Sequence, residues 1–273
     1  MRRALAIDEA GFGAENPVVA IRLNNLAQLL QATNRLTEAE PLTRRALAID
    51  EASFGTEHPN VAIRLNNLAM LLRNTNRLTE AEPLMRRALA IDEARFGAEH
   101  PNVAIRLNNL ALLLLDTNRL TEAEPLIRRA LAIDEASFGG EHPSFAIRLS
   151  NLAALLKVTN RPNEAEPLMR RALAIDEASY GAEHPTVAIC LNNLAILMIA
   201  TNRLNEAEPL MRCAVEILLR FKQLTGHSHP NLAAYAKDYR AMLYLLEFTP
   251  EQIQTRLHEI AVRFELGASD SAA

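Results

Sequence analysis

The sequence has no tryptophan, few aromatic residues and no excess of basic charge. Aromatic residues make up 4% of the 273 positions, so a buried core must consist of aliphatic side chains and alanine. The formal net charge of −4 argues against a nucleic-acid partner, because proteins that bind nucleic acid carry a basic patch or stripe. No uncharged apolar run approaches the ~18 residues of a membrane span. We therefore expect neither a nucleic-acid nor a membrane partner.

Cysteines are also scarce, and an apolar stretch typical of a signal peptide is missing from the first residues. The start, Met1-Arg2-Arg3-Ala4, lacks the apolar region of a signal peptide. The two cysteines, Cys190 and Cys213, stand where other copies of a repeated segment have arginine, so they do not form a disulfide framework. We expect a protein of the reducing cytoplasm.

What the sequence does contain is a repeat of 42 residues. The segment Arg44-Arg45-Ala46-Leu47-Ala48-Ile49-Asp50 returns at Arg86, Arg128 and Arg170. Between the copy that starts at Arg44 and the copy that starts at Arg86, only 6 of 42 positions differ. A fixed period of this length indicates stacked supersecondary units, not a globule with one central core.

Each unit is predicted to contain two helices. In the second copy, Pro59 suits the first position of a helix, and Leu65, Leu68, Ala69 and Leu72 follow at helical spacing. The chain turns near residues 75–76. A second helix then follows, ending at Gly97, which we expect in the left-handed conformation.

The start of the second helix has the pattern of a capping box. In Thr79-Glu80-Ala81-Glu82, the Thr79 hydroxyl and the Glu82 side chain are expected to bond each other's backbone N–H groups. In four of the five expected full repeats a histidine precedes the proline of the first helix, and we expect it to pack at the helix start. This arrangement recurs at His58, His100, His142 and His184.

The repeat resembles the tetratricopeptide repeat, in the 42-residue form found in kinesin light chains and in bacterial multi-repeat proteins. The resemblance lies in Leu65-Asn66-Asn67-Leu68-Ala69, Glu80-Ala81-Glu82-Pro83-Leu84 and Phe96-Gly97 with His100-Pro101. It covers about residues 1–225 and implies an all-α, right-handed solenoid of tandem helix-turn-helix repeats. The expected boundaries are an orphan second helix at 1–13, five full repeats at 17–55, 59–97, 101–139, 143–181 and 185–225, and a degenerate capping repeat at 229–267, with residues 268–273 frayed.

The family resemblance also implies a binding surface. In tetratricopeptide arrays, the face of the first helices opposite the core stripe lines a concave groove that holds peptides. Carried over to this chain, the resemblance implies contact with a ligand for Asn25, Asn67, Asn109, Asn151, Asn193, Asn66, Asn108, Ile63, Ile105, Met70, Leu112, Asn74 and Asp116. An amide both donates and accepts hydrogen bonds, so a row of asparagines can pair with the backbone of a peptide of any sequence.

The repetition of these residues is also consistent with roles that involve no ligand. Recent duplication copies every residue, so repetition alone does not prove selection, and the asparagines can bond neighbouring helices instead of a ligand. Positions such as Gln28, Met70 and Leu112, which vary between copies, fit differing peptide subsites but also fit relaxed selection on exposed positions.

Charge separates the chain from the kinesin light chains that it resembles. A position that is often Arg in that family is Asp50, Asp92, Asp134 and Asp176 here, and one that is often Lys is Ile63, Ile105, Ile147 and Ile189. We therefore predict a neutral to acidic, partly apolar groove whose partner is a neutral or basic protein segment with apolar residues.

No pattern of catalysis is present in the sequence. The recurring histidines are dispersed, one in each repeat, and His227-Ser228-His229 has no third metal ligand beside it. We expect no enzyme, no cofactor and no metal, and predict a non-catalytic protein–protein interaction scaffold. The alternative is an assembly or regulatory portion of a larger signalling protein, which packs on its own domains or self-associates through the uncapped helix at residues 1–13.

Overall fold

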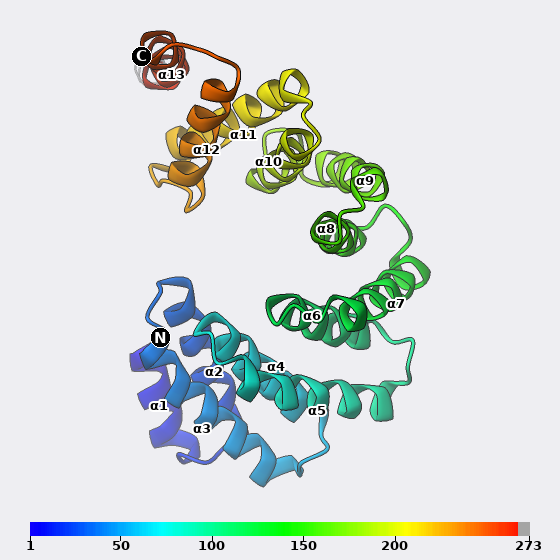
Figure 1. Cartoon of the computed structure of the whole chain (residues 1–273). Coiled ribbons are helices and arrows are strands. Elements are labelled where there is room, and N and C mark those ends of the chain that lie inside the picture. Colours follow the sequence, from blue (N-terminus) through cyan, green and yellow to red (C-terminus); the bar gives the residue numbers. More distant parts are fainter. Residues whose placement is uncertain (267–273) are drawn as a thin grey trace. The chain divides into compact units, whose positions relative to one another are not determined.

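The structure is a computed structural model that describes residues 1–266. Over these residues the chain forms helices and no strands. Five helical hairpins follow one another in the chain, each with a first and a second helix (Figure 1). Their bounds are α2 Pro17–Ala32 with α3 Leu36–Phe54, α4 Pro59–Asn74 with α5 Leu78–Phe96, α6 Pro101–Asp116 with α7 Leu120–Phe138, α8 Pro143–Val158 with α9 Pro162–Tyr180, and α10 Pro185–Ala200 with α11 Leu204–Thr225.

Three further helices flank the five hairpins. α1 (Arg2–Phe12) precedes them, and α12 (Leu232–Leu245) and α13 (Pro250–Leu266) follow. The expected all-α arrangement of tandem hairpins is thereby confirmed. The last residue of the expected capping repeat and the expected frayed end, residues 267–273, lie outside the described part.

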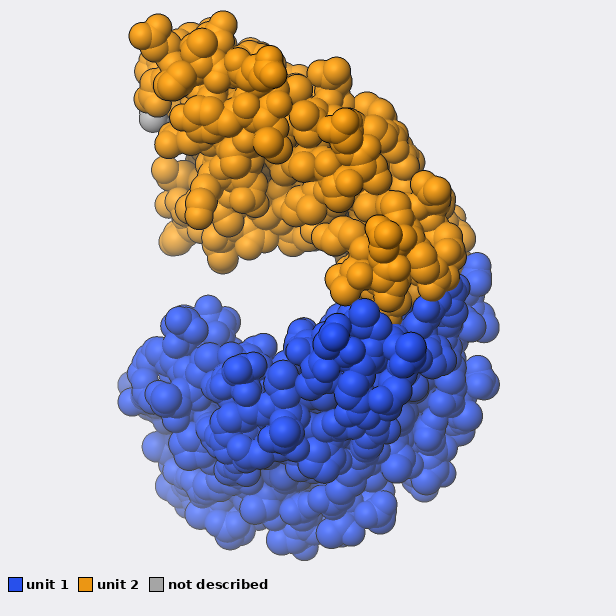
Figure 2. All heavy atoms as spheres, in the orientation of Figure 1, with its two compact units in different colours: residues 1–137 blue, residues 138–273 orange. Residues whose placement is uncertain are grey.

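The chain divides into two compact units. The first comprises residues 1–137 and the second begins at Phe138 (Figure 2). Unit 1 therefore contains α1–α6 and nearly all of α7, and unit 2 contains α8–α13.

Each first helix begins at a proline, which a histidine precedes in α4, α6, α8 and α10 and which Asn16 precedes in α2. His58 adopts the extended N-cap conformation before α4, and its Nδ1 accepts the backbone N–H of Asn60 at 3.1 Å. The ring also stacks on Phe54 at the end of α3, with centroids 4.6 Å apart. The same stack and cap recur at His100, so the expected role of these histidines at the helix start is confirmed.

The hairpin turn depends on an asparagine with positive φ. In the second repeat Thr75 caps α4, Asn76 has φ 59°, and the Arg77 N–H then donates to the Leu72 carbonyl at 2.8 Å. At the other end of α5, Gly97 has φ 87° and ψ 159°. Its φ is positive, as expected for glycine, but its ψ is extended, so the prediction of a left-handed helical cap is wrong.

The predicted capping boxes of the second helices are also wrong. α5 begins at Leu78, which makes Thr79 its second residue, and no side chain caps this end. The Glu82 carboxylate instead accepts from Arg86 and from Arg119 of the next repeat. Charged guanidinium donors one turn and one repeat away compete successfully with the backbone N–H.

Close packing between the two helices of a hairpin depends on alanine. In the second repeat, Val61, Ala62 and Leu65 of α4 form one fully buried cluster with Ala88 and Ile91 of α5. α6 and α7 bury an equivalent cluster that includes Ala130. Because alanine adds only a methyl group, it lets the two helix backbones approach, and neighbouring aliphatic side chains fill the remaining space.

Candidate functional site

The candidate site is the surface of the first helices that points away from their second helices, here called the first-helix face. Each unit carries such a face by itself, formed by α2, α4 and α6 in unit 1 and by α8 and α10 in unit 2. The structure leaves five of its asparagines half-buried on this face. They are Asn25, Asn67, Asn109, Asn151 and Asn193.

The asparagines of unit 1 bond one repeat to the next. Asn67 Nδ2 donates to Asn24 Oδ1 at 2.7 Å, and Asn109 Nδ2 donates to Asn66 Oδ1 at 2.9 Å. Asn66 and Asn108 are buried, so they lie beneath the surface where a ligand would bind. The inter-helix role weighed in the sequence is therefore present. Because the Nδ2 groups of Asn67 and Asn109 are used in these bonds, their Oδ1 atoms are the groups that could accept a hydrogen bond from a peptide N–H.

Isoleucine side chains form an exposed apolar feature that recurs on this face. Ile63 is 41% exposed and Ile105 is 42% exposed, and Ile21 on α2 is also exposed. In unit 2, Ile147 occupies the same position and is 53% exposed. An apolar side chain that stays exposed at one position of successive repeats forms a stripe, and such stripes mark interaction surfaces more often than isolated exposed residues do.

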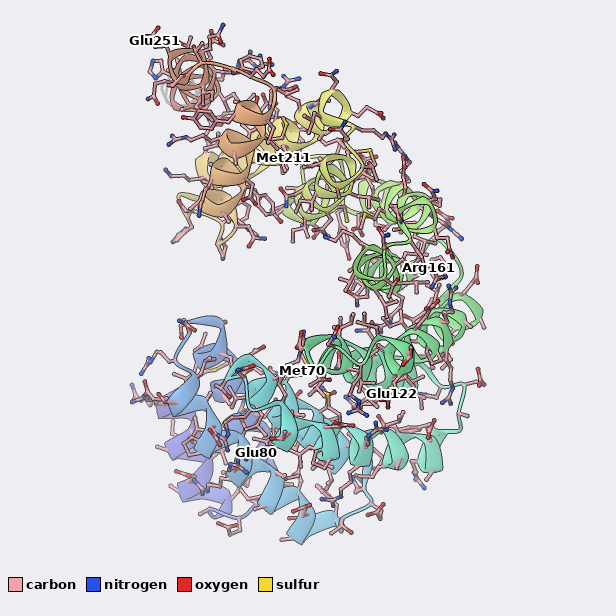
Figure 3. All side chains as sticks on the ribbon, in the orientation of Figure 1. Met70, Glu80, Glu122, Arg161, Met211 and Glu251 are labelled. Atoms are coloured by element: carbon pink, nitrogen blue, oxygen red, sulfur yellow. The ribbon has the colours of Figure 1, made fainter. Side chains whose placement is uncertain are left out.

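The variable positions of this face differ in exposure. Met70, labelled in Figure 3, and Leu112 are half-buried, whereas Asn74 and Asp116 are exposed. Arg73 of α4 forms an ion pair with Asp116 of α6, so the carboxylate of Asp116 is already matched by a cation. The varied residues of unit 1 thus contribute polar and apolar groups but little net charge.

The predicted acidic contribution of the second helices is wrong. Asp50 and Asp92 are each 1% exposed, because they lie beneath the first helices and not on the surface. Asp50 Oδ2 accepts from Arg64 Nε at 2.8 Å, and Asp92 is paired with Arg106 at the same distance. Sequence comparison with the family overlooked these arginines, which lie 14 residues after their partners in each repeat.

One repeat of unit 2 lacks this buried cation. Cys190 takes the place of the arginine, and its Sγ donates to Asp176 Oδ2 at 3.1 Å. Burial raises the pKa of Asp176 above its ordinary value, and burial with the neighbouring carboxylate raises the pKa of Cys190 to about 12. Cys190 is thus a protonated, unreactive thiol. Cys213 is exposed, and both cysteines are free.

Arginine–glutamate pairs connect the repeats on the side of the hairpin turns. Arg77 bonds Glu40 of the preceding repeat and Glu80 of its own, and Arg119 repeats this with Glu82 and Glu122. Glu80 and Glu122 are labelled in Figure 3. Hydrogen bonding from Arg77 lowers the pKa of Glu40. Helical spacing can indicate pairs within one helix, such as Glu82 with Arg86, but it cannot show contacts between repeats.

Among the described residues, no group of three or more histidine, cysteine, aspartate or glutamate side chains could hold a metal ion. None of the described helices is both long and apolar enough to cross a membrane.

Comparison with known proteins identifies the repeat. The sequence profile of the tetratricopeptide repeat matches residues 19–94, 61–136, 103–178 and 144–220. No curated protein matches the chain. A Podosopora anserina protein described as a kinesin light chain with nearly identical repeats has a similar fold, with a TM-score of 0.63 at 24% identity over 76% of this chain and 98% of that one.

Two further structures share the fold. BtubC from P. vanneervenii gives a TM-score of 0.66 at 23% identity, covering 84% of this chain and 90% of that one. PilF of Pseudomonas aeruginosa gives 0.52 at 18% identity, covering 88% and 97%. At these identities the likeness concerns the arrangement of helices and not the ligand.

Proposed function

Because the chain belongs to the tetratricopeptide repeat family, we propose that it is a non-catalytic scaffold that binds a peptide or protein segment along the first-helix face. Tetratricopeptide repeats in general serve as scaffolds for protein–protein interaction. In the family this face lines the concave groove. The observation that carries the proposal is the stripe of exposed isoleucines, Ile21, Ile63 and Ile105, in unit 1.

The residues of this face suggest how a segment would bind. The isoleucines would bury apolar side chains of the partner, and the Oδ1 atoms of Asn67 and Asn109 would accept from its backbone. Since Asp50 and Asp92 are buried and paired, they give no reason for a basic partner. We therefore propose a partner segment of little net charge in which the apolar residues provide most of the affinity. We also propose that the interaction takes place in the cytoplasm, where the two free cysteines stay reduced.

The test is a pull-down in which charge is placed on the stripe. Ile63→Glu with Ile105→Glu should abolish capture of the partner without loss of helicity, because both side chains are exposed. The matched control is Ala90→Glu with Ala132→Glu, which adds the same charge at exposed positions of α5 and α7. A partner retained equally by both double variants would move the binding site away from this face.

A second candidate is self-association, or packing against neighbouring domains, through α1. Ile7 is 62% exposed and Ala4 is exposed, although the corresponding Ile91 and Ala88 of α5 are buried. Light scattering tests it: Ile7→Glu should lower the mass of any oligomer, and a monomer at high concentration would remove this candidate.

A further inference from the structure

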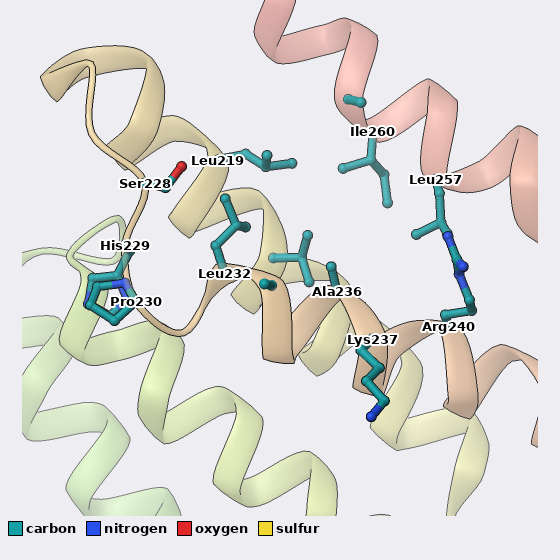
Figure 4. Close-up of a pocket in the computed structure, with 13 residues that line it drawn as sticks. Leu219, Ser228, His229, Pro230, Leu232, Ala236, Lys237, Arg240, Leu257 and Ile260 are labelled. Carbon is teal, nitrogen blue, oxygen red and sulfur yellow. The ribbon is translucent and has the colours of Figure 1, made fainter.

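A cavity of about 760 Å³ lies within unit 2, between α11, α12 and α13 (Figure 4). Its size falls within the ~300–1,000 Å³ of typical ligand pockets. The walls are mainly aliphatic, with Leu219 from α11, Leu232 and Ala236 from α12, and Leu257 and Ile260 from α13. It is separate from the exposed isoleucine stripe of unit 1 that carries the proposed function.

The cavity lies where the last hairpin lacks the alanines of the others. Ala88 lies twelve residues after Asn76, the positive-φ residue of its turn. In the last hairpin the positive-φ residue of the turn is Glu247. α13 begins three residues after Glu247, whereas α5 begins two residues after Asn76. The position that corresponds to Ala88 is therefore Ile260, which is also buried. Ile260 carries three more side-chain carbons than alanine and lines the cavity between α12 and α13, where a methyl group would allow closer helix packing.

The start of α13 shows the same change. Ile253 occupies the position of Ala81 in α5, and both are buried. The extra residue of the turn is fixed by a genuine capping box, in which the Thr249 N–H donates to Gln252 Oε1 at 2.8 Å and the Gln252 N–H donates to Thr249 Oγ1 at 3.3 Å. The altered register of α13 is therefore built into its sequence.

The side of α12 that a second helix would cover is consequently open. Ala62 and Ala69 of α4 are buried, and Ala62 packs in one cluster with Ala88 and Ile91 of α5. The residues at the same positions of α12 are Ala233 and Arg240, and both are exposed and line the cavity. In the second repeat the equivalent side of α4 is covered by side chains of the helix α5. The exposed side of α12 is therefore suited to the side chains of another helix.

The charge at the cavity is of one sign. Lys237 and Arg240 border it, both are exposed, and neither forms an ion pair with a described residue. None of the described residues that line the cavity is acidic. Two uncompensated cations beside an aliphatic hollow favour an apolar ligand that carries carboxylates.

We infer that this cavity is a docking site for an acidic amphipathic helix of a partner protein, which inserts aliphatic side chains between α12 and α13 and places carboxylates beside Lys237 and Arg240. Helices that dock in this manner present apolar anchors at positions i, i+3, i+4 and i+7. The inference goes beyond the proposed function, because it adds a second binding site of different charge preference.

The test uses fluorescence anisotropy with a labelled 15-residue peptide that carries leucine at those four anchor positions and glutamate on its other face. A matched peptide has lysine in place of every glutamate. We expect the acidic peptide to bind at least tenfold more tightly than the basic one. Ala236→Trp, which fills the cavity, should weaken acidic-peptide binding at least tenfold, and Lys237→Glu should weaken it at least fivefold.

Two controls keep the result specific. Ala234→Trp adds the same ring to an exposed position of α12 outside the cavity, and Lys222→Glu reverses an exposed charge of α11 outside it; both should bind the acidic peptide within twofold of the unaltered chain. Because Lys237→Glu lies at the surface, it tests the site even if Ala236→Trp folds poorly.

Several outcomes would overturn the inference. These are equal binding of the two peptides, loss of affinity in the controls as large as in the cavity variants, or no binding. Tight binding of dodecanoate without the peptide would assign the cavity to a small amphiphile, and a dimer that Ala236→Trp dissociates would assign it to a second copy. Ile63→Glu with Ile105→Glu should leave acidic-peptide binding unchanged, so failure here and failure of the proposed function are distinguishable.

Discussion

The second repeat, α4 with α5, and the carboxyl-terminal helices α10–α13 follow the same helix–turn–helix plan but make different contacts. In the second repeat, Arg64 forms a buried ion pair with Asp50 of the preceding helix α3, and the Asn67 amide donates a hydrogen bond to Asn24. Ala88 of α5 packs tightly against α4. Towards the carboxyl terminus each of these contacts is altered.

The altered contacts can be named one by one. Asp176 meets Cys190 instead of arginine, the amide of Asn192 has a buried Oδ1 that finds no hydrogen-bond partner among the described residues, and Ile260 stands in place of alanine. A shared backbone plan therefore does not determine how tightly the two helices of a repeat pack. A few polar pairs and small side chains do, and each pair of corresponding positions can be tested.

The largest effect is expected at the buried ion pair. Arg64→Met should lower the free energy of unfolding by about 3–5 kcal/mol, because it leaves the buried Asp50 carboxylate without a cation. Cys190→Ala should cost much less, since no cation is lost beside Asp176. Urea denaturation of the two variants compares them, and equal losses would show that the arginine does not compensate the buried charge.

A larger side chain should destabilise the tightly packed hairpin α4–α5 more than the open hairpin α12–α13. Ala88→Ile should lower the free energy of unfolding by about 1–3 kcal/mol, because the site is fully buried against α4. Ala236→Ile adds the same volume beside the cavity and should cause little loss. Thermal unfolding followed by circular dichroism checks this, and an equal fall in midpoint would mean that the cavity has no room.

The amide pairs should show a smaller difference. Asn66→Ala removes the acceptor of the Asn109 Nδ2 group and should lower the free energy of unfolding by about 1 kcal/mol. Asn192→Ala removes a buried oxygen that has no partner among the described residues, so its effect should be neutral or slightly stabilising. Chemical denaturation measures both, and a larger loss for Asn192→Ala would contradict the assignment of its unpaired oxygen.

The smallest effect is expected from the exposed ion pairs. Arg77 lowers the pKa of Glu40 in the folded chain. The ion pair therefore contributes to folding stability at pH values above the ordinary pKa of a glutamate, and this contribution is lost as the pH falls through the lowered pKa. Glu40→Gln should therefore lower stability at pH 7 by no more than about 1 kcal/mol and by less at pH 3. Unfolding at both pH values tests this, and the same loss at pH 3 would exclude an ionic cause.

The sequence predicted most of the regular architecture and less of the interactions that close it. The period predicted the helical hairpins, and the proline at the start of each first helix predicted where that helix begins, because both depend on residues close in the chain. The Asp50–Arg64 pair and the Arg119–Glu82 pair join helices whose relative rotation is set by packing, so spacing alone could not predict them. For the same reason the capping box predicted at Thr79 and Glu82 is wrong.

The candidate site was predicted unevenly for a similar reason. Helical periodicity placed Asn67 and Ile63 on the face away from the second helix, but it could not show that Asn66 is buried or that Asn67 donates to Asn24. The cavity was not predicted at all. The signal that could have revealed it is the change from alanine to isoleucine at position 260, together with the extra residue in the preceding turn.

Amide hydrogen exchange of α5 and α13 tests most directly the claim that the last hairpin is open because it lacks the close alanine contact. Few tight contacts around a helix lower its local stability and hence the protection of its amides. We predict that the backbone amides of α13 exchange at least tenfold faster than those of α5, and that bound acidic peptide slows exchange in α13 but not in α5. Equal protection of the two helices in the free chain would contradict the account.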